Sequence, residues 1–373
     1  MAETNKKQRP IAIPETKGTF SVSGHVSGVL SKRFYSESVS QNGQSRRSLQ
    51  FSVQVDPENK VYVELSAAPT DRVYFSKNIE ENGKRSVSVE SVKWADRKSK
   101  AAEALVKDGY RMMGVSVGIE RKIDERGTES NDVVNLAPYD AAEYLSSHLR
   151  DDMPVLVRGN IRYSSYNGRR YRRFEITHIY YSKKVETAHT DPNAEPNQSD
   201  FHCRFVYTGI AADPSKSTRQ VISAKIIGYN TVEDTEFLIE NGAIAQNIRR
   251  NIKPYSMIEV DGNIVNRKLE EDVADQGCWG TPNRMSIRRA PTVTEMIICA
   301  VYPDKTDSTV YNEQSVSEAI AAAKANRQAR SDYGEQNSAA SNFSAPQMNY
   351  HTTISNEKSN DAAPWDDEDG WED

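Results

Sequence analysis

The chain has 373 residues, a formal net charge of −5 and 27% charged residues. This length favours two domains with additional segments. Cys203, Cys278 and Cys299 are too few and too scattered for a disulfide framework, and none belongs to a pattern of zinc ligands. The polar N-terminus lacks a secretory core, and no stretch of about 18 apolar residues could span a membrane. We therefore expect a cytoplasmic protein.

After a polar start at 1–17, which we expect to be flexible, the sequence has the pattern of a β-rich domain over 18–185. Segments of β-branched and aromatic residues with period-two stretches predict strands at 19–30, 48–55, 60–67, 155–163 and 174–181. A short helix is predicted at 139–149. The segment 68–138 is an insertion, with a strand predicted at 85–92, a helix at 96–108 and a strand at 112–120.

A polar linker with two prolines, 186–200, separates a second domain over 201–305. Its predicted elements are strands at 201–210, 220–228, 257–265 and 292–302 and a helix at 243–250. The segments 153–161 and 256–264 share one pattern, and both end in Gly-Asn-Ile. Three strands, a helix and a final hairpin are the order of an OB-fold, a five-stranded Greek-key barrel. The repeat strengthens this assignment. The expected fold class is therefore mainly β, with two tandem OB-fold barrels.

The C-terminal end has a different composition. An alanine-rich stretch predicts a helical segment within 306–330. Residues 331–373 are polar without an apolar period, so a disordered linker and acidic tail are predicted there. The last residues, 361–373, hold seven acids and no base, while the rest of the chain has 48 bases and 46 acids. A nearly neutral body thus carries a separate acidic tail.

The segment 151–184 carries the strongest binding signal, with eight bases against three acids. Asn167-Gly168 is the favoured two-residue type I′ hairpin turn. With that turn, Val157, Gly159, Ile161, Phe174 and Ile176 share an apolar side that packs the barrel. The opposite side pairs Arg162 with Arg173 and Arg158 with Thr177. Opposed like charges destabilise a sheet, so this pairing favours an anion bound across that face.

Arginines that bind phosphates and tyrosines that stack on bases are what a single-strand groove requires. The alternative is a solvated hairpin tip whose arginines only aid solubility. The position favours binding, because the loop between the fourth and fifth strands is one of two that OB-folds use for ligands. The candidate residues are Arg158, Arg162, Tyr163, Tyr166, Arg169, Arg170, Tyr171, Arg172 and Arg173.

The other ligand loop joins the first and second strands, and it is again basic and aromatic. Its candidates are Lys32, Arg33, Phe34, Tyr35, Arg46 and Arg47, although an ordinary polar loop fits the composition equally well. In the second barrel the loop between the fourth and fifth strands contributes Arg267, Lys268 and Trp279. Trp279 fits a plug of the barrel end as well as a stacking residue.

The acidic tail contains two tryptophans, which do nothing for solubility. With the tandem Gly-Asn-Ile barrels, it makes the chain resemble single-stranded DNA-binding proteins of bacteria and their viruses. The resemblance implies a tail that docks onto replication, recombination and repair proteins. The usual bacterial tail ends in an apolar Pro-Phe pair, which is absent here. Two fused barrels fit a bacteriophage protein, which would act in the host cytoplasm. The alternative is a solubilising terminus. The partner-binding candidates are Trp365, Asp366, Asp367, Glu368, Asp369, Trp371, Glu372 and Asp373.

No P-loop, dinucleotide fingerprint, zinc-protease motif or nucleophile elbow occurs in the sequence. We therefore expect no enzyme, no catalytic residue, no metal and no cofactor. The predicted function is sequence-nonspecific binding and protection of single-stranded DNA, with recruitment of replication and recombination partners by the tail. Two alternatives remain: an RNA-binding OB protein, and a non-catalytic scaffold whose barrels bind proteins.

Overall fold

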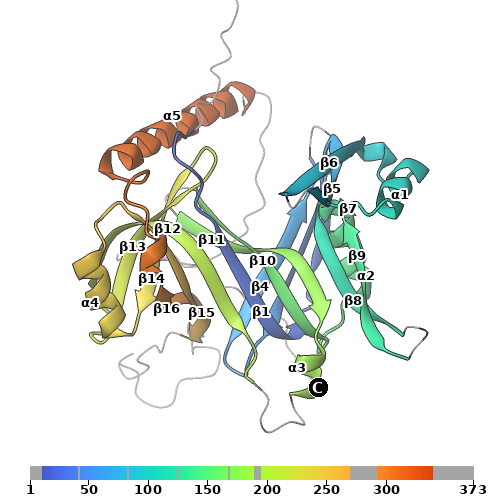
Figure 1. The fold of residues 1–373 in the computed structure, drawn as a ribbon, viewed down its shortest axis with the longest axis horizontal. Helices are drawn as coiled ribbons and strands as arrows, with labels where there is room; N and C mark the ends of the chain where they lie inside the picture. The colour runs from blue at the N-terminus through green and yellow to red at the C-terminus, as the bar shows by residue number, and fades with distance from the viewer. Residues whose placement is uncertain are drawn as a thin grey trace, which may run out of the picture. The chain divides into compact units, whose positions relative to one another are not determined.

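The computed structural model describes residues 11–40, 43–81, 84–123, 125, 127–166, 169–188, 195–268 and 292–338. The chain is mainly β and forms two compact units, whose elements are labelled in Figure 1. The first unit is Thr19–Ile161 with Arg173–Asp200. The second unit is Arg162–Arg172 with the described residues of 1–18 and 201–373. Neither unit is continuous in sequence, whereas the sequence predicts one boundary at 186–200.

The first unit contains a closed circuit of five strands. β1 pairs antiparallel with both β10 and β3, β3 pairs antiparallel with β4, β4 runs parallel to β11, and β11 lies beside β10. The helix α2 (Pro138–His148) precedes β10 in the chain, and α3 (Lys183–Thr187) follows β11. The five strands are β1 (Gly18–Ser27), β3 (Ser45–Gln54), β4 (Lys60–Ala67), β10 (Pro154–Tyr166) and β11 (Arg169–Tyr181).

Alternation along these strands builds the core of the circuit. Val61, Val63 and Leu65 of β4 are buried, because every second side chain of a strand points to the same side. Gly159 of β10 lies where a Cβ would be 1.9 Å from the carbonyl oxygen of Glu175 and 2.7 Å from the ring of Phe20. The glycine therefore allows strand β11 and an aromatic ring of β1 to approach β10 closely.

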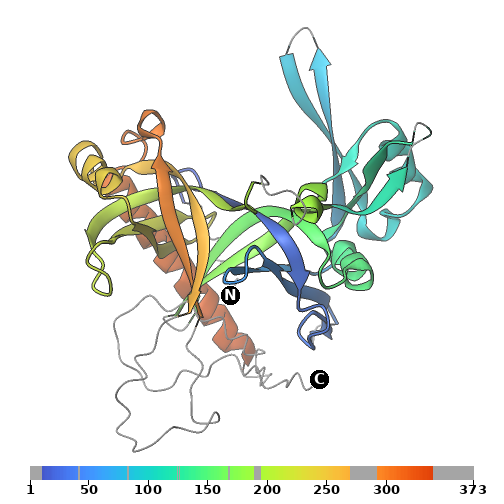
Figure 2. The same ribbon diagram turned by 90° about the horizontal axis from the view of Figure 1, so that it is seen from below.

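The insertion contains more strands than the sequence predicts. A separate sheet has the order β6-β5-β7 and packs one face on α1. Figure 2 shows the β5–β6 hairpin projecting from the rest of its unit. The hairpin of β8 and β9 follows, and β8 runs parallel to β11. The elements are β5 (Arg72–Glu81), β6 (Lys84–Lys93), η1 (Trp94–Asp96), α1 (Lys100–Lys107), β7 (Arg111–Met112), β8 (Val115–Ile123) and β9 (Glu129–Leu136).

The second unit repeats the circuit. β12 pairs antiparallel with β13, β13 with β14 and β15 with β16, β14 runs parallel to β16, and β15 lies beside β12. The helix α4 (Gly242–Asn251) precedes β15, as α2 precedes β10. The strands are β12 (Ser199–Ala212), β13 (Gln220–Ile227), β14 (Val232–Ile239), β15 (Met257–Lys268) and β16 (Thr292–Val301).

The segment 11–17, expected to be flexible, packs in the second unit. Ile13 is buried with Val316 and Ala319 of the helix α5 (Glu313–Ser338), which follows the short helix η3 (Pro303–Lys305). The backbone N–H of Thr16 donates to the carbonyl of Ile227 at 2.9 Å. Ile13 stands between Ala12 and Pro14 in a segment too short to show an apolar period, so the sequence alone does not reveal this contact. No helix in the described part of the chain is long and apolar enough to cross a membrane.

Candidate nucleic-acid interface

The strand β10 orients its side chains as the sequence predicts. Val157, Gly159 and Ile161 are buried, while Arg158 and Arg162 are exposed. The hydroxyl of Thr177 donates to the carbonyl of Arg158 at 3.2 Å, so the two residues lie opposite each other as the predicted register requires. The turn residues Asn167 and Gly168 lie outside the described residues. The outer side of this strand therefore presents two arginines to solvent.

Part of the hairpin tip is packed rather than open. Within the second unit, Arg170 lies 3.4 Å from the carboxylate of Glu236, and Arg172 donates to the main-chain carbonyls of Glu236 at 3.4 Å and Thr294 at 3.5 Å. Burial lowers the pKa of Arg172. These two arginines are ligand candidates in the sequence, but the structure gives them intramolecular carbonyl and carboxylate partners.

Tyr163 is also a structural residue. Its hydroxyl lies 4.0 Å from Cys203 Sγ and 3.9 Å from Met296 Sδ, and the guanidinium of Arg172 lies 6.0 Å from its ring centre. Burial raises the pKa of the Tyr163 hydroxyl well above its usual range and that of the Cys203 thiol to about 12. A ring held in this way is not available to stack on a base. The strand is long enough for Tyr163 to lie beyond the first unit, which the sequence pattern does not reveal.

The remaining hairpin candidates differ in exposure. Arg169 is exposed, and Tyr171 is half-buried. Arg173 is half-buried, and its guanidinium lies 3.7 Å from the carboxylate of Glu64 on β4. The side chain of Tyr166 is outside the described set. The exposed bases of the hairpin are therefore Arg158, Arg162 and Arg169, while Arg170 and Arg173 are partly exposed and each lies near a carboxylate.

The predicted loop between the first two barrel strands is largely a β-hairpin, in which β2 (Tyr35–Val39) pairs with the start of β3. Phe34 is 6% exposed, and it therefore offers no ring to a ligand. Tyr35 is half-buried, and burial raises its pKa. Lys32, Arg33 and Arg46 are exposed. Three bases of the predicted set thus remain at the surface.

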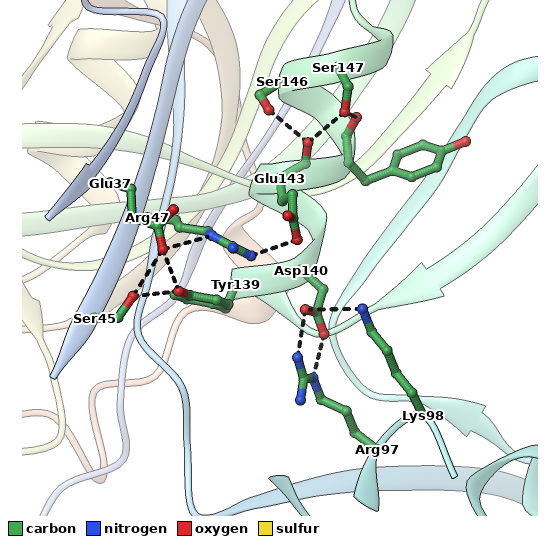
Figure 3. Close-up of polar contacts among 11 residues, drawn as sticks. Glu37, Ser45, Arg47, Arg97, Lys98, Tyr139, Asp140, Glu143, Ser146 and Ser147 are labelled. Atoms are coloured by element: carbon green, nitrogen blue, oxygen red, sulfur yellow. Dashed lines mark hydrogen bonds and ion pairs between the residues drawn. The ribbon is translucent and has the colours of Figure 1, made fainter. Parts of the chain in front are cut away.

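Arg47 anchors the hairpin to helix α2, as Figure 3 shows. Its guanidinium donates to Glu143 at 2.8 Å, lies 3.5 Å from Glu37 and sits 4.0 Å from the ring centre of Tyr139. The Tyr139 hydroxyl donates in turn to Glu37 at 2.8 Å. Two carboxylates and an aromatic ring occupy this guanidinium, so Arg47 holds the loop in place and is not an open phosphate ligand.

The same helix is tied to the insertion through Asp140. Arg97 donates to both of its carboxylate oxygens, at 2.6 and 2.9 Å, and Lys98 lies 3.7 Å away (Figure 3). Burial alone would raise the pKa of Asp140. The hydrogen bonds of Arg97 and the charges of Arg97 and Lys98 outweigh burial, so the pKa stays below its usual range. This two-point contact fixes the start of α2 beside η1 and α1.

The sequence reading missed Tyr62, which is 52% exposed on β4. Its neighbours Val61 and Val63 point into the core, so alternation could have placed Tyr62 on the outer side. Glu64 of β4 is level with Glu175 of β11 in a parallel pairing. Two residues before this pair, Tyr62 on β4 and Arg173 on β11 lie on the same outward-facing side of their strands as Glu64 and Glu175 do. An aromatic ring and a guanidinium therefore share the outer face of these two strands.

The corresponding row of the second unit is acidic. A Cβ on Gly262 of β15 would overlap the carbonyl oxygen of Ile297, just as a Cβ on Gly159 would overlap that of Glu175. Ile297 and Glu175 therefore occupy equivalent positions in the two units. Leu238 pairs in parallel with Ile297, which makes Leu238 equivalent to Glu64. Two residues earlier, Glu236 and Glu295 therefore stand where the first unit has Tyr62 and Arg173.

Both carboxylates have cationic partners within their own unit. Glu236 faces Arg170, and Glu295 accepts a hydrogen bond from Arg219 at 2.8 Å. Burial raises the pKa of Glu236. The face that would meet a nucleic acid in this unit therefore carries acids paired to arginines of the same molecule.

The other predicted positions are beyond what the structure describes. Arg267 and Lys268 end strand β15, but their side chains are outside the described set, as are Trp279 and the whole tail with its candidates from Trp365 to Asp373. Among the described residues, no group of three or more histidine, cysteine or acidic side chains could hold a metal ion.

A family model named YorF matches residues 17–336 of the chain. Among solved structures, the wild-type single-stranded DNA-binding protein of Thermus aquaticus matches with 8% identity and a TM-score of 0.33, covering 78% of this chain and 93% of that one. A deletion mutant of that protein matches with 8% identity and a TM-score of 0.34, covering 77% and 94%. A replication protein A heterotrimer bound to single-stranded DNA matches at 7% identity and a TM-score of 0.21, over 86% and 100%. No curated protein matches the chain.

Proposed function

The chain belongs to the YorF family, and we propose that it is a non-catalytic protein that binds single-stranded DNA on the outer face of its first unit. The proposed strand path crosses β3, β4 and β11 towards β10 and needs no base-specific contact. Binding would protect the strand. The acidic tail, 361–373, would recruit replication or recombination proteins through Trp365, Trp371 and the carboxylates around them.

The strand circuits support this function. Each unit has the pairing of an OB barrel: the first strand lies between the second and fourth, the third is parallel to the fifth, and a helix precedes the fourth. We therefore assign both units as OB barrels. OB-folds bind oligonucleotides on the face of strands two and three and on the loops that flank it. In the first unit these strands are β3 and β4.

One observation carries the proposal: the exposed Tyr62 and Arg173 share the outer face of β4 and β11, each two residues before the paired Glu64 and Glu175. A tyrosine ring on a basic surface stacks on a base of any sequence, while guanidinium groups bind the phosphates. Exposed bases of the same unit include Lys60 on the same strand, Arg158 on β10, and Lys32, Arg33 and Arg46 near the β2–β3 hairpin.

The second unit is assigned a supporting role. Its equivalent row is Glu236 and Glu295, with Asp234 one step further along β14 and 2.6 Å from Lys225. Carboxylates at this face repel phosphates, and the arginines that neutralise them are already engaged. The proposed strand site is therefore confined to the face of the first unit.

The test is a fluorescence-anisotropy titration of labelled oligo-dT with the full chain at two salt concentrations. The variant Tyr62→Ala removes the proposed stacking ring. Tyr229→Ala is its matched control, because Tyr229 is 69% exposed and lies between β13 and β14. We expect tight binding that weakens steeply with salt, a loss of about fivefold or more with Tyr62→Ala, and no change with Tyr229→Ala.

Competitors decide between the alternative functions. Duplex DNA should fail to displace oligo-dT, and oligo-U should displace it less well than unlabelled oligo-dT. Preferential displacement by oligo-U would replace the DNA assignment with RNA. No binding at low salt, with or without residues 361–373, would leave a protein-interaction scaffold as the function of the barrels.

A further inference from the structure

The insertion sheet has one packed face and one open face. Val73 and Phe75 of β5 are buried against Ala102 of α1, so this side is the core of the insertion. Cross-strand partners point to the same side of a sheet. The opposite side therefore carries the residues that alternate with these two, beginning with Arg72 and Tyr74.

The pairing of the three strands fixes what surrounds Tyr74. Tyr74 is opposite Ser91 of β6, and Ser76 is opposite both Val89 of β6 and Arg111 of β7. On the β7 side, the N–H of Met113 donates to the carbonyl of Tyr74 at 2.8 Å, which places Met113 beside it. The exposed fractions of Tyr74, Val89 and Met113 are 49%, 52% and 54%.

Cations flank this apolar centre. Arg72 is opposite Lys93, and its guanidinium donates to the side chain and the carbonyl of Ser91 at 3.0 and 3.1 Å. Lys93 and Arg111 are exposed, and neither forms an ion pair with another described residue. None of the described residues in these three rows is acidic. We call Arg72, Tyr74, Val89, Lys93, Arg111 and Met113 the insertion platform.

We propose that the insertion platform is a second contact for the nucleic-acid strand, on which Tyr74 stacks a base and Arg72, Lys93 and Arg111 bind neighbouring phosphates. This inference rests on the proposed function and extends it to a part of the chain outside both barrels. An aromatic ring on the middle strand of an open sheet is a known way of presenting a stacking surface to unpaired bases.

The charges decide against a second copy of the chain as the occupant. Two platforms placed face to face would bring Arg72, Lys93 and Arg111 of both copies together, which is unfavourable. An acidic polyanion with flat apolar groups complements the same surface. Single-stranded nucleic acid has this composition, because its phosphates alternate with bases that stack.

The experiment varies strand length with the full chain. Oligo-dT is used from about 8 nucleotides, the scale of one OB-fold site, to several times that length. Tyr74→Ala removes the ring, Tyr74→Phe retains it, and Tyr229→Ala is the control. We expect Tyr74→Ala to leave short strands unaffected and to weaken long strands by about fivefold or more. Tyr74→Phe and Tyr229→Ala should bind as the wild type does.

Two further measurements make the assignment specific. The double variant K93S/R111S should reduce the salt dependence of the affinity for long strands by the equivalent of about two phosphate contacts. The salt dependence of the affinity for short strands should not change. Photocrosslinking of an iododeoxyuridine strand should label Tyr74 in the wild type, and the label should disappear in Tyr74→Ala.

The possible outcomes distinguish a failure of this inference from a failure of the proposed function. If Tyr62→Ala weakens binding at every length but Tyr74→Ala at none, the platform is overturned and the barrel site stands. If no strand binds the wild type, both fall together. If Tyr74→Ala abolishes binding of poly-glutamate but leaves every DNA affinity unchanged, the platform is a docking site for acidic proteins and the nucleic-acid assignment is wrong.

Discussion

Gly262 faces the ring of Phe201 so closely that a Cβ at this position would lie 2.6 Å from two of the ring carbons. The same relationship holds between Gly159 and Phe20, at 2.7 Å from one ring carbon. In each unit the glycine belongs to the Gly-Asn-Ile sequence that first indicated a repeat. The repeat is therefore a steric requirement: the first strand of the final hairpin must admit an aromatic ring and a backbone carbonyl at one point.

The first prediction concerns this contact. Gly159→Ala and Gly262→Ala should each lower the free energy of unfolding by about 2–3 kcal/mol, because the added methyl group overlaps backbone that cannot move freely. Urea unfolding of the full chain measures the change. Gly209→Ala serves as the control, because a Cβ there meets nothing within 4 Å. Equal stabilities for all three variants would contradict the steric account.

A second prediction separates two arginines of one hairpin. Arg172→Ala should lower the free energy of unfolding by about 2 kcal/mol, because it leaves the carbonyls of Glu236 and Thr294 without their donor. Arg158→Ala should leave stability unchanged and weaken DNA binding, with the salt dependence reduced by about one phosphate contact. The pair is measured by urea unfolding and anisotropy. If Arg172→Ala instead weakened DNA binding and left stability unchanged, the hairpin tip would belong to the binding site.

The third prediction is a pH dependence from Asp140. Its pKa is lowered in the folded chain, so its contribution to stability is complete above the ordinary value of 3.8 and is lost as the pH falls through the lower folded value. Asp140→Asn should therefore cost about 2 kcal/mol at neutral pH. The difference from wild type should shrink as urea unfolding is repeated from pH 6 down to pH 3. A stability difference that stays constant over this pH range would show that ionisation of Asp140 is not its cause.

The fourth prediction concerns the acidic tail. Deleting residues 361–373 should tighten DNA binding modestly, because a tethered polyanion competes with the strand for the same cations at an effective concentration set by its linker. The deletion should also remove capture of replication or recombination proteins, measured by affinity purification against the full chain. Exchanging Trp365 and Trp371 for alanine should remove capture while leaving DNA affinity unchanged. A deletion that alters neither property would reduce the tail to a solubilising terminus.

Alternation made much of the fold predictable. The inward set of β10, from Val157 to Ile161, and the outward Arg158 follow from period two together with one turn signal. The mainly β class follows in the same way. Strands β2, β5, β9 and β14 were missed because polar and charged residues interrupt their apolar patterns, and β14 was missed although it is the third strand of the second circuit.

The candidate site was less accessible to sequence reasoning. The sequence does not distinguish an arginine that is open to a phosphate, as Arg158 is in our proposal, from one that is already bound within the protein, as Arg47 and Arg172 are. Only the positions of Glu143 and Glu236 decide between the two, and both lie far away in sequence. Tyr62 was overlooked because one tyrosine among valines resembles core, although its place in the alternation puts it outside.

The composition of the second unit from three separate segments has a consequence for biosynthesis. Residues 11–18 and Arg162–Arg172 are synthesised before most of the strands they join, from Phe201 onward. All strands of the first barrel have been synthesised once the ribosome passes residue 200. Ile13, by contrast, can be buried only after α5 has been synthesised. A fragment that starts at Phe201 would therefore lack two of its own parts, and fragments cut at the linker should not be expected to fold as independent halves.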